Sequence, residues 1–194
     1  MSAPMVGDEP GSWPVAESTD LHRDHWVLAL RADRITAPSG GDPFRRLVVE
    51  LPGAVMILAV DAEDRVVVLR QYRHPVGARL VELPAGLLDV AGEDPEDAAR
   101  RELREEAGLA AEHWEHLLTV YPSPGISSET HAIYLATGLS EVGRGDFVVE
   151  HEEAEMSVER VPFDDLVDAV LDGRVRDAPL AVGLLAYQVR RARE

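Results

Sequence analysis

The residues best suited to chemistry are the glutamates of the segment GLLDVAGEDPEDAARRELREEAGL, which runs from Gly86 to Leu109. A helix turns by about 100° per residue, so Glu102, Glu105 and Glu106 would fall within roughly 100° of one another on one face. Glu102 and Glu106 form an i,i+4 like-charge pair, which costs an isolated helix roughly 0.2–0.5 kcal/mol. Such clustered carboxylates are typical ligands for a hard divalent cation that also meets phosphate oxygens.

The remaining charges of the same segment are arranged to attract. Three opposite-sign i,i+4 pairs are expected, and these are Glu96–Arg100, Asp97–Arg101 and Arg101–Glu105. Uncompensated negative charge is therefore concentrated on a single face. On composition alone, a solvated acidic helix is the more common explanation of such a face. The metal-site interpretation consequently needs a second signal.

The overall composition limits what such a site could serve. The chain has 194 residues and a net charge of −17, from 36 acidic and 19 basic residues, and it has no cysteine. This balance argues against non-specific nucleic-acid binding, and the missing cysteine excludes disulfides and thiolate metal sites. Neither a secretory signal nor an apolar run of the roughly 18–20 residues that span a membrane is present, so we expect a cytoplasmic protein. Because the protein is strongly negative, it would repel a phosphate substrate unless bound cations or local arginines made the site positive.

The elements that must position the glutamates are predicted as a mixed α/β sandwich, because strands both precede and separate the helices. The glutamate helix is expected to begin after a cap at Asp94, with Pro95 in its first position, and to end near Ala107 before Gly108. Strands are predicted at 53–60, 65–72, 79–83, 114–121, 130–137 and 155–161, and closing helices at 164–172 and 178–193.

The chain is expected to have three parts. Residues 1–20, rich in proline, glycine, serine and acids, are predicted to be a flexible N-terminal segment. Residues 21–52 are predicted to form a small N-terminal β region, in which a hairpin pairs 25–35 with 44–51. Residues 53–194 would then form the main α/β domain.

The second signal is a motif. Residues Arg101 to Leu109, RELREEAGL, resemble the Nudix hydrolase family, whose pattern R-E-U-x-E-E-x-G-U is matched at every specified position, where U is a bulky aliphatic residue. Seven residues separate Glu93 from Arg101, as the pattern requires, and the resemblance gives Glu93 a supporting role in the loop. Gly86 departs from the pattern, because six residues separate it from Glu93 where the family has five. We therefore expect a one-residue bulge in that loop.

The resemblance implies an α/β/α sandwich with a mixed sheet and a Mg²⁺-dependent pyrophosphohydrolase, with Mn²⁺ as the alternative ion. Glu102 and Glu106 would be the principal metal ligands, and Glu105 an additional one. Arg101 would orient these carboxylates. Ala85 would present its backbone carbonyl to the metal. The bound ion would bridge phosphate oxygens and lower the pKa of an attacking water.

Other residues resemble the branch of the family that hydrolyses ADP-ribose. Pro124, the fifteenth residue beyond Leu109, stands with Gly125 in SPGISSE, the usual context of a proline that marks this branch. An ordinary Pro-Gly turn between two strands is the alternative explanation. In RQYRH and ELPAG, Arg73 would contact a phosphate or ribose, and Glu82 would bind sugar hydroxyls or assist the metal. A surface arginine and a strand-end cap are the alternatives for these two residues.

The acidic stretch HEEAE offers a general base. By resemblance to the same branch, Glu153, with Glu152 as the next candidate, would deprotonate the attacking water or complete the metal site. A charged loop without function is the alternative. The products would be AMP and ribose 5-phosphate, and the enzyme would be a homodimer that uses its N-terminal β region. Other possible substrates are GDP-mannose, NADH and diadenosine polyphosphates, and a non-catalytic ADP-ribose sensor is less favoured because all the box glutamates are present.

Overall fold

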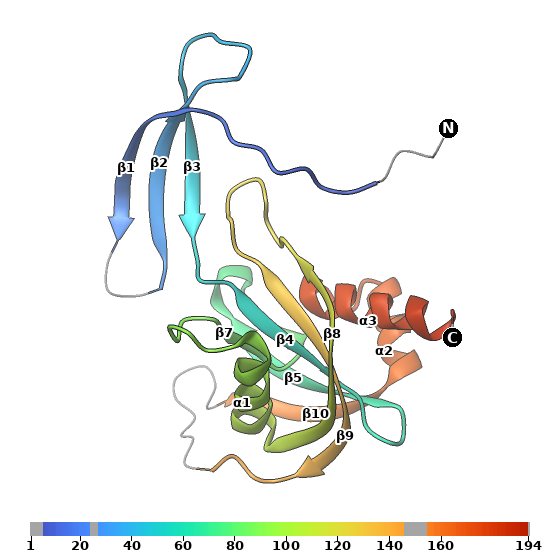
Figure 1. Cartoon of the computed structure of the whole chain (residues 1–194). Helices are drawn as coiled ribbons and strands as arrows, with labels where there is room; N and C mark the ends of the chain where they lie inside the picture. Colours follow the sequence, from blue (N-terminus) through green and yellow to red (C-terminus); the bar gives the residue numbers. More distant parts are fainter. Residues whose placement is uncertain (1–5, 24–26, 146–154, 194) are drawn as a thin grey trace. The chain divides into compact units, whose positions relative to one another are not determined.

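The computed structural model describes residues 6–23, 27–145 and 155–193 (Figure 1). The chain forms two compact units, one of residues 1–51 with 125–128 and the other of 52–124 with 129–194. Among the described residues, no helix is long and apolar enough to cross a membrane. The domain boundaries expected at residues 20 and 52 stay predictions.

The smaller unit is a three-stranded antiparallel sheet in the order β1-β2-β3. Its strands are β1 (Val15–Arg23), β2 (Ala29–Ile35) and β3 (Phe44–Glu50), so the predicted hairpin is confirmed. The expected flexible segment 1–20 is wrong over its last residues, because 15–20 belong to β1. This strand is held by its ladder to β2 and by a hydrogen bond from Ser18 Oγ to Asp33 Oδ1 of 2.6 Å. Its mainly polar sequence, exposed along its whole length, gives no hydrophobic alternation from which it could be predicted.

The larger unit contains two sheets. The first has the order β7-β4-β9-β8, with β4 (Ala54–Ala59) parallel to β9 (His131–Glu141) and antiparallel to β7 (Ala85–Leu87), while β8 (Leu109–Val120) runs antiparallel to β9. The second is antiparallel, in the order β10-β5-β6. Its strands are β10 (Ser157–Pro162), β5 (Arg65–Arg73) and β6 (Ala78–Glu82), and a 3₁₀ turn, η1 (His74–Val76), joins the last two. The mixed sheet predicted from the sequence is confirmed.

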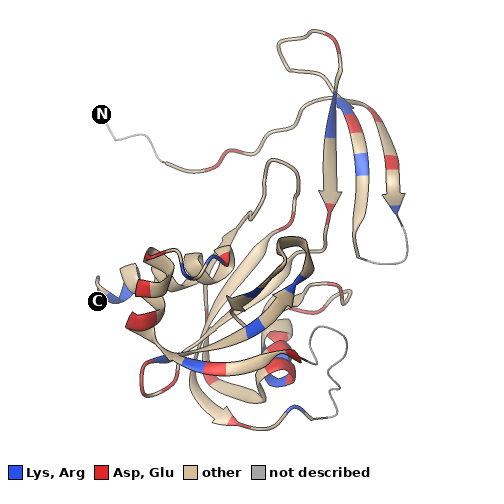
Figure 2. Cartoon of the chain, turned by 180° about the vertical axis from the view of Figure 1, so that it is seen from behind, with Lys and Arg blue, Asp and Glu red and all other residues tan. Residues whose placement is uncertain are grey.

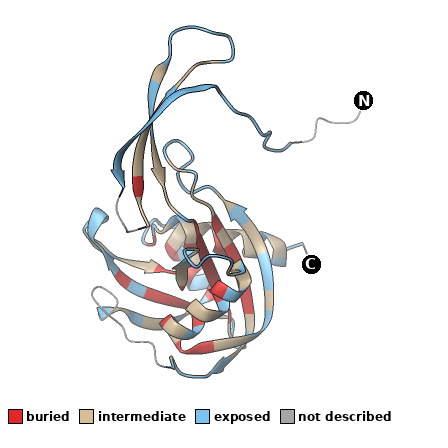
Figure 3. Ribbon diagram, turned by 60° about the vertical axis from the view of Figure 1, so that its left-hand side comes forward, coloured by how far each residue is buried: buried red, intermediate tan, exposed pale blue. Residues whose placement is uncertain are grey.

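Helices cover both faces of the first sheet, because β4 is buried on both sides. Val55 and Ile57 belong to a core with Leu103 of α1 (Pro95–Ala107). Met56 and Leu58 belong to a second core with α2 (Phe163–Leu171) and α3 (Ala178–Arg191). The buried residues in Figure 3 lie mainly in these strands and on the helix faces that cover them. The expected α/β/α sandwich is therefore confirmed.

The short strand β7 was not predicted, and β8 begins earlier than expected. Residues 84–87 read Pro-Ala-Gly-Leu, a sequence with turn signals that only the ladder to β4 holds extended. In contrast, β8 starts directly after Gly108, which has a φ of 70° and ends α1 in the left-handed conformation. Both differences matter because β7 and the end of α1 flank the glutamates.

Candidate metal and substrate site

The helix α1 forms where the sequence predicts it, and its ends are capped as expected. The Asp94 side chain accepts a hydrogen bond of 2.9 Å from the backbone N–H of Glu96. At the other end, the backbone N–H of Gly108 donates to the carbonyl oxygen of Arg104 at 2.9 Å. Ala98, Ala99 and Leu103 are fully buried against the sheet, which fixes the rotation of the helix about its axis. The glutamate face is fixed with it.

Arg101 gathers the carboxylates of this face. Its Nη1 donates to Glu102 Oε1 at 2.6 Å and to Glu105 Oε2 at 3.1 Å, and its Nη2 donates to Glu93 Oε2 at 3.0 Å. The guanidinium holds the pKa of Glu93 below its usual range through this hydrogen bond. Acidic and basic residues accordingly share α1 in Figure 2. Arg101 thus contacts three carboxylates, and its orienting role in catalysis stays a prediction.

The strand β7 lies against the same face. The backbone N–H of Ala85 donates to Glu106 Oε2 at 2.8 Å, and Glu106 is only 8 % exposed. A Cβ built on Gly86 would lie 2.1 Å from the carboxyl carbon of Glu102. Glycine therefore allows the close approach of this carboxylate, which would have to move if a Cβ were added.

The extra residue between Gly86 and Glu93 is accommodated in a turn. The backbone N–H of Glu93 donates to the carbonyl oxygen of Val90 at 3.2 Å, and Gly92 has a φ of 82°. Gly86 still faces Glu102, and Glu93 still reaches Arg101, so the added length leaves both ends of the loop at the helix.

The donors fit a hard divalent cation in chemical type. Carboxylate oxygens of Glu102, Glu105 and Glu106 lie on one partly accessible face, and Gly86 leaves the space that Glu102 occupies. Within the described residues, no three His, Asp or Glu side chains yet converge as a ready-made metal-binding group. A site of this chemical type usually holds its ion with one or two carboxylates, together with waters and substrate phosphates.

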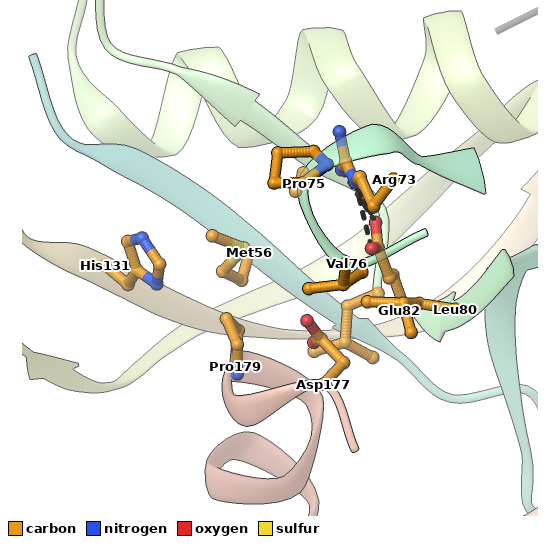
Figure 4. Close-up of a pocket in the computed structure, with 11 residues that line it drawn as sticks. Met56, Arg73, Pro75, Val76, Leu80, Glu82, His131, Asp177 and Pro179 are labelled. Atoms are coloured by element: carbon orange, nitrogen blue, oxygen red, sulfur yellow. Dashed lines mark hydrogen bonds and ion pairs between the residues drawn. The ribbon is translucent and has the colours of Figure 1, made fainter. Parts of the chain in front are cut away.

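A cavity of about 320 Å³, which Ala85 also lines, lies beside this strand (Figure 4). Its walls come from β4, β5, β6, β7, β9, η1 and the start of α3. Arg73, at the end of β5, donates from Nε and Nη2 to the carboxylate of Glu82 at 2.7–3.1 Å. The two residues expected to contact substrate are thus joined to each other, and both line this cavity.

Two further polar residues of the cavity were missed in the sequence. Asp177 caps α3 by accepting from the backbone N–H of Leu180 at 2.9 Å, and burial raises its pKa to about 6. His131 is 9 % exposed; its Nε2 lies 3.2 Å from Glu129 Oε1, and its Nδ1 is buried without a hydrogen-bond partner among the described residues. The N-cap pattern Asp-Ala-Pro predicts a helix start at Asp177, but no local signal indicates the cavity.

The other residues expected in the site are not among the contacts described above. Pro124 and Gly125 form an exposed turn, and their role in substrate binding stays a prediction. Glu152 and Glu153 lie outside the described residues, so the general base also stays a prediction. Close to that segment, Arg144 Nη2 donates to the carbonyl oxygen of Glu106 at 2.8 Å and so anchors the last turn of α1.

Comparisons with known proteins agree with this architecture. A family model described as NUDIX domain matches residues 50–181. The chain is 47 % identical over 160 residues to an ADP-ribose pyrophosphatase of Mycobacterium tuberculosis, covering 82 % of this chain and 76 % of that protein. It is 34 % identical over 166 residues to an ADP-ribose pyrophosphatase of Bacillus subtilis, covering 86 % and 88 %. A crystal structure of an ADP compounds hydrolase shares the fold, with a TM-score of 0.74, 22 % identity, and coverage of 94 % of this chain and 95 % of that one.

Proposed function

The chain belongs to the Nudix family, and from this membership we propose that it hydrolyses the diphosphate of ADP-ribose to AMP and ribose 5-phosphate. The observation that carries the proposal is the set of carboxylates that Arg101 and β7 gather on one face of α1. The two ADP-ribose pyrophosphatases among its relatives support the choice of substrate. A divalent cation fits the donors, and we propose Mg²⁺, with Mn²⁺ as the alternative.

We assign the metal to Glu102, Glu106, Glu105 and the backbone carbonyl of Ala85. When bound, the ion would neutralise phosphate charge and lower the pKa of a coordinated water. The contacts of these side chains support the assignment. The N–H of Ala85 holds one oxygen of Glu106, while Arg101 keeps Glu102 and Glu105 together despite their like charges.

The remaining steps fall to other side chains. We propose Glu153, or Glu152 in its place, as the general base that accepts the proton of the attacking water. Arg73 uses Nε and Nη2 for Glu82, which leaves Nη1 outside the ion pair and suited to an oxygen of the substrate. Glu82, Pro124 and Gly125 are proposed to bind substrate as well. We further propose that the protein acts in the cytoplasm as a homodimer.

The function is tested by a substrate panel with Mg²⁺. Release of AMP is measured from ADP-ribose, NADH and diadenosine tetraphosphate, and release of GMP is measured from GDP-mannose. We expect the highest kcat/KM with ADP-ribose. A clear preference for another member would replace the substrate but leave the reaction class. Binding of ADP-ribose without turnover of any member would instead indicate a sensor.

The metal assignment is tested by Glu106→Gln, which keeps the shape of the side chain. We expect kcat to fall by at least about 10²-fold, the scale for loss of one key electrostatic group. Thermal unfolding should show that the variant folds. Near wild-type turnover in this variant would refute the assignment.

Glu153→Gln should lower kcat more than it changes KM if Glu153 acts in the transition state.

A further inference from the structure

The last turn of α1 has less support from the hydrophobic core than the rest of the helix. Leu103 is the last fully buried residue of α1, and Glu105 and Glu106 follow it. The final carbonyl groups of a helix have no amide partner within it, so helix ends fray unless other groups bind them. The position of these two glutamates therefore depends on contacts from outside the helix.

The loop that leaves β9 supplies such contacts. Residues 142–145 read Val-Gly-Arg-Gly and follow directly on that strand. The backbone N–H groups of Val142 and Gly143 donate to the carbonyl oxygen of Gly108 at 2.9 and 3.0 Å. A Cβ built on Gly108 would lie 3.6 Å from the Cα of Gly143, so this loop packs directly against the end of α1.

Arg144 extends the contact to the last turn of the helix. Its Nη2 donates to the carbonyl oxygen of Glu106 at 2.8 Å, and the bond is partly buried. In a longer helix the amide of Ala110 would bind this carbonyl, but Ala110 belongs to β8. Gly143 and Gly145, on either side of the arginine, have φ values of 71° and 64°, which other residues rarely adopt. The loop therefore turns on both sides of Arg144 and presents its guanidinium to the helix end.

We propose that Arg144 is a positioning residue for the metal site, which holds the backbone of Glu106 and thereby keeps its carboxylate in place. Glu106 is then held at two points, because its carboxylate also accepts a hydrogen bond of 2.8 Å from the N–H of Ala85. The inference rests on the proposed function and extends it to a residue outside both the carboxylate face and the cavity.

The sign of the effect on metal binding separates positioning from simple charge. Removal of a positive charge near carboxylates strengthens the binding of a divalent cation, by Coulomb's law. Loss of a contact that positions a ligand weakens the same binding. A lower metal affinity after removal of Arg144 is therefore opposite to what the change in charge would produce.

The test measures the binding of Mn²⁺ to the full chain by electron paramagnetic resonance, which does not depend on turnover. We expect Arg144→Ala to weaken binding by about tenfold, the lower end of the scale for groups that orient a metal ligand. Arg144→Lys should bind within about threefold of the wild type, because a lysine can also donate to the last carbonyls of a helix. Thermal unfolding of each variant checks that it folds.

The matched control is Arg176→Ala. The Nε of Arg176 donates to the carbonyl oxygen of Gly173 at 3.1 Å, shortly after the end of α2, and the residue is exposed. This variant removes the same charge and the same kind of hydrogen bond at a helix end that holds no glutamate of the site. We expect its affinity for Mn²⁺ to equal that of the wild type.

A double-mutant cycle tests whether Arg144 acts through Glu106. In the Glu106→Gln background the carboxylate is already lost, so we expect Arg144→Ala to change the affinity by less than about twofold. A general structural role of Arg144 would instead weaken binding equally in both backgrounds.

The outcomes separate the inference from the proposed function. No loss of affinity in Arg144→Ala, or an equal loss in both backgrounds, would overturn the role of Arg144 alone, provided that Glu106→Gln weakens binding. Unchanged Mn²⁺ binding in Glu106→Gln would overturn the metal assignment and, with it, the role of Arg144.

Discussion

At the scale of single residues, some side chains of the site are brought together by local sequence, and others only by the packing of distant elements. Glu102, Glu105 and Glu106 could be predicted because helical periodicity alone brings them to one face. Asp177 and His131 could not, because only the packing of α3 and β9 around one cavity brings them together. The pairing of Arg73 with Glu82 depends in the same way on the register of β5 and β6.

The raised pKa of Asp177 leads to a prediction about how stability depends on pH. Burial raises its pKa in the folded protein to about 6 from an ordinary 3.8, a rise of about two units. The folded state therefore binds the proton more tightly than the unfolded state. The stabilisation is complete below pH 3.8 and is lost as the pH rises through about 6. At 1.36 kcal/mol per unit, the loss above pH 7 is on the order of 3 kcal/mol.

Asp177→Asn removes this dependence, because asparagine stays neutral at every pH. We expect its free energy of unfolding to exceed that of the wild type at pH 8 and to approach it near pH 4. Urea unfolding at the two pH values measures the difference, with Asp172→Asn as the exposed control. A gain of the same size at both pH values would show that the charge of Asp177 is not its cause.

At the scale of elements, the site depends on the contact between β7 and α1. Caps, periodicity and the motif made α1 predictable over nearly its full length. The strand β7 could not be predicted, because three residues between a proline and a loop are too few to show a hydrophobic alternation. Its position is set by the ladder to β4, a contact between residues about thirty positions apart in the sequence.

Gly86→Ala tests this contact between the two elements. The added methyl group would meet the carboxyl end of Glu102, a flexible side chain that can move away at little cost in stability. We expect a nearly unchanged melting temperature and a kcat/KM at least about tenfold lower, since small displacements of catalytic groups have large kinetic effects. Gly11→Ala, where a Cβ meets nothing within 4 Å, is the matched control. A large fall in melting temperature with normal activity would contradict the role given to Gly86.

At the scale of the whole molecule, the two units differ in how much they bury. The larger unit has two hydrophobic cores, whereas Ala29 and Asp33 are the only buried residues among the described residues of the smaller unit. Leu21 on β1 and Leu47 on β3 are 46 % and 40 % exposed. A sheet with so little core is expected to gain stability from a partner surface, and a second copy of the chain is the partner we propose.

The homodimer is tested by sedimentation or light scattering. We expect the wild-type protein to be dimeric, and Leu21→Asp with Leu47→Asp to produce monomers, because two charges would have to be buried in the interface. Leu171→Asp, at a residue of α2 that is 69 % exposed, should leave the dimer intact. A monomeric wild-type protein at micromolar concentration would exclude the proposal.

The double role of Ala85 also bears on how this protein could change through evolution or design. One backbone group of this residue serves the carboxylate face, while the residue itself forms part of the cavity wall. The carboxylate face and the cavity therefore meet at one residue of β7. Substitutions at Leu80, His131 or Asp177 would therefore alter the cavity wall while the residues from Glu93 to Glu106 are held constant.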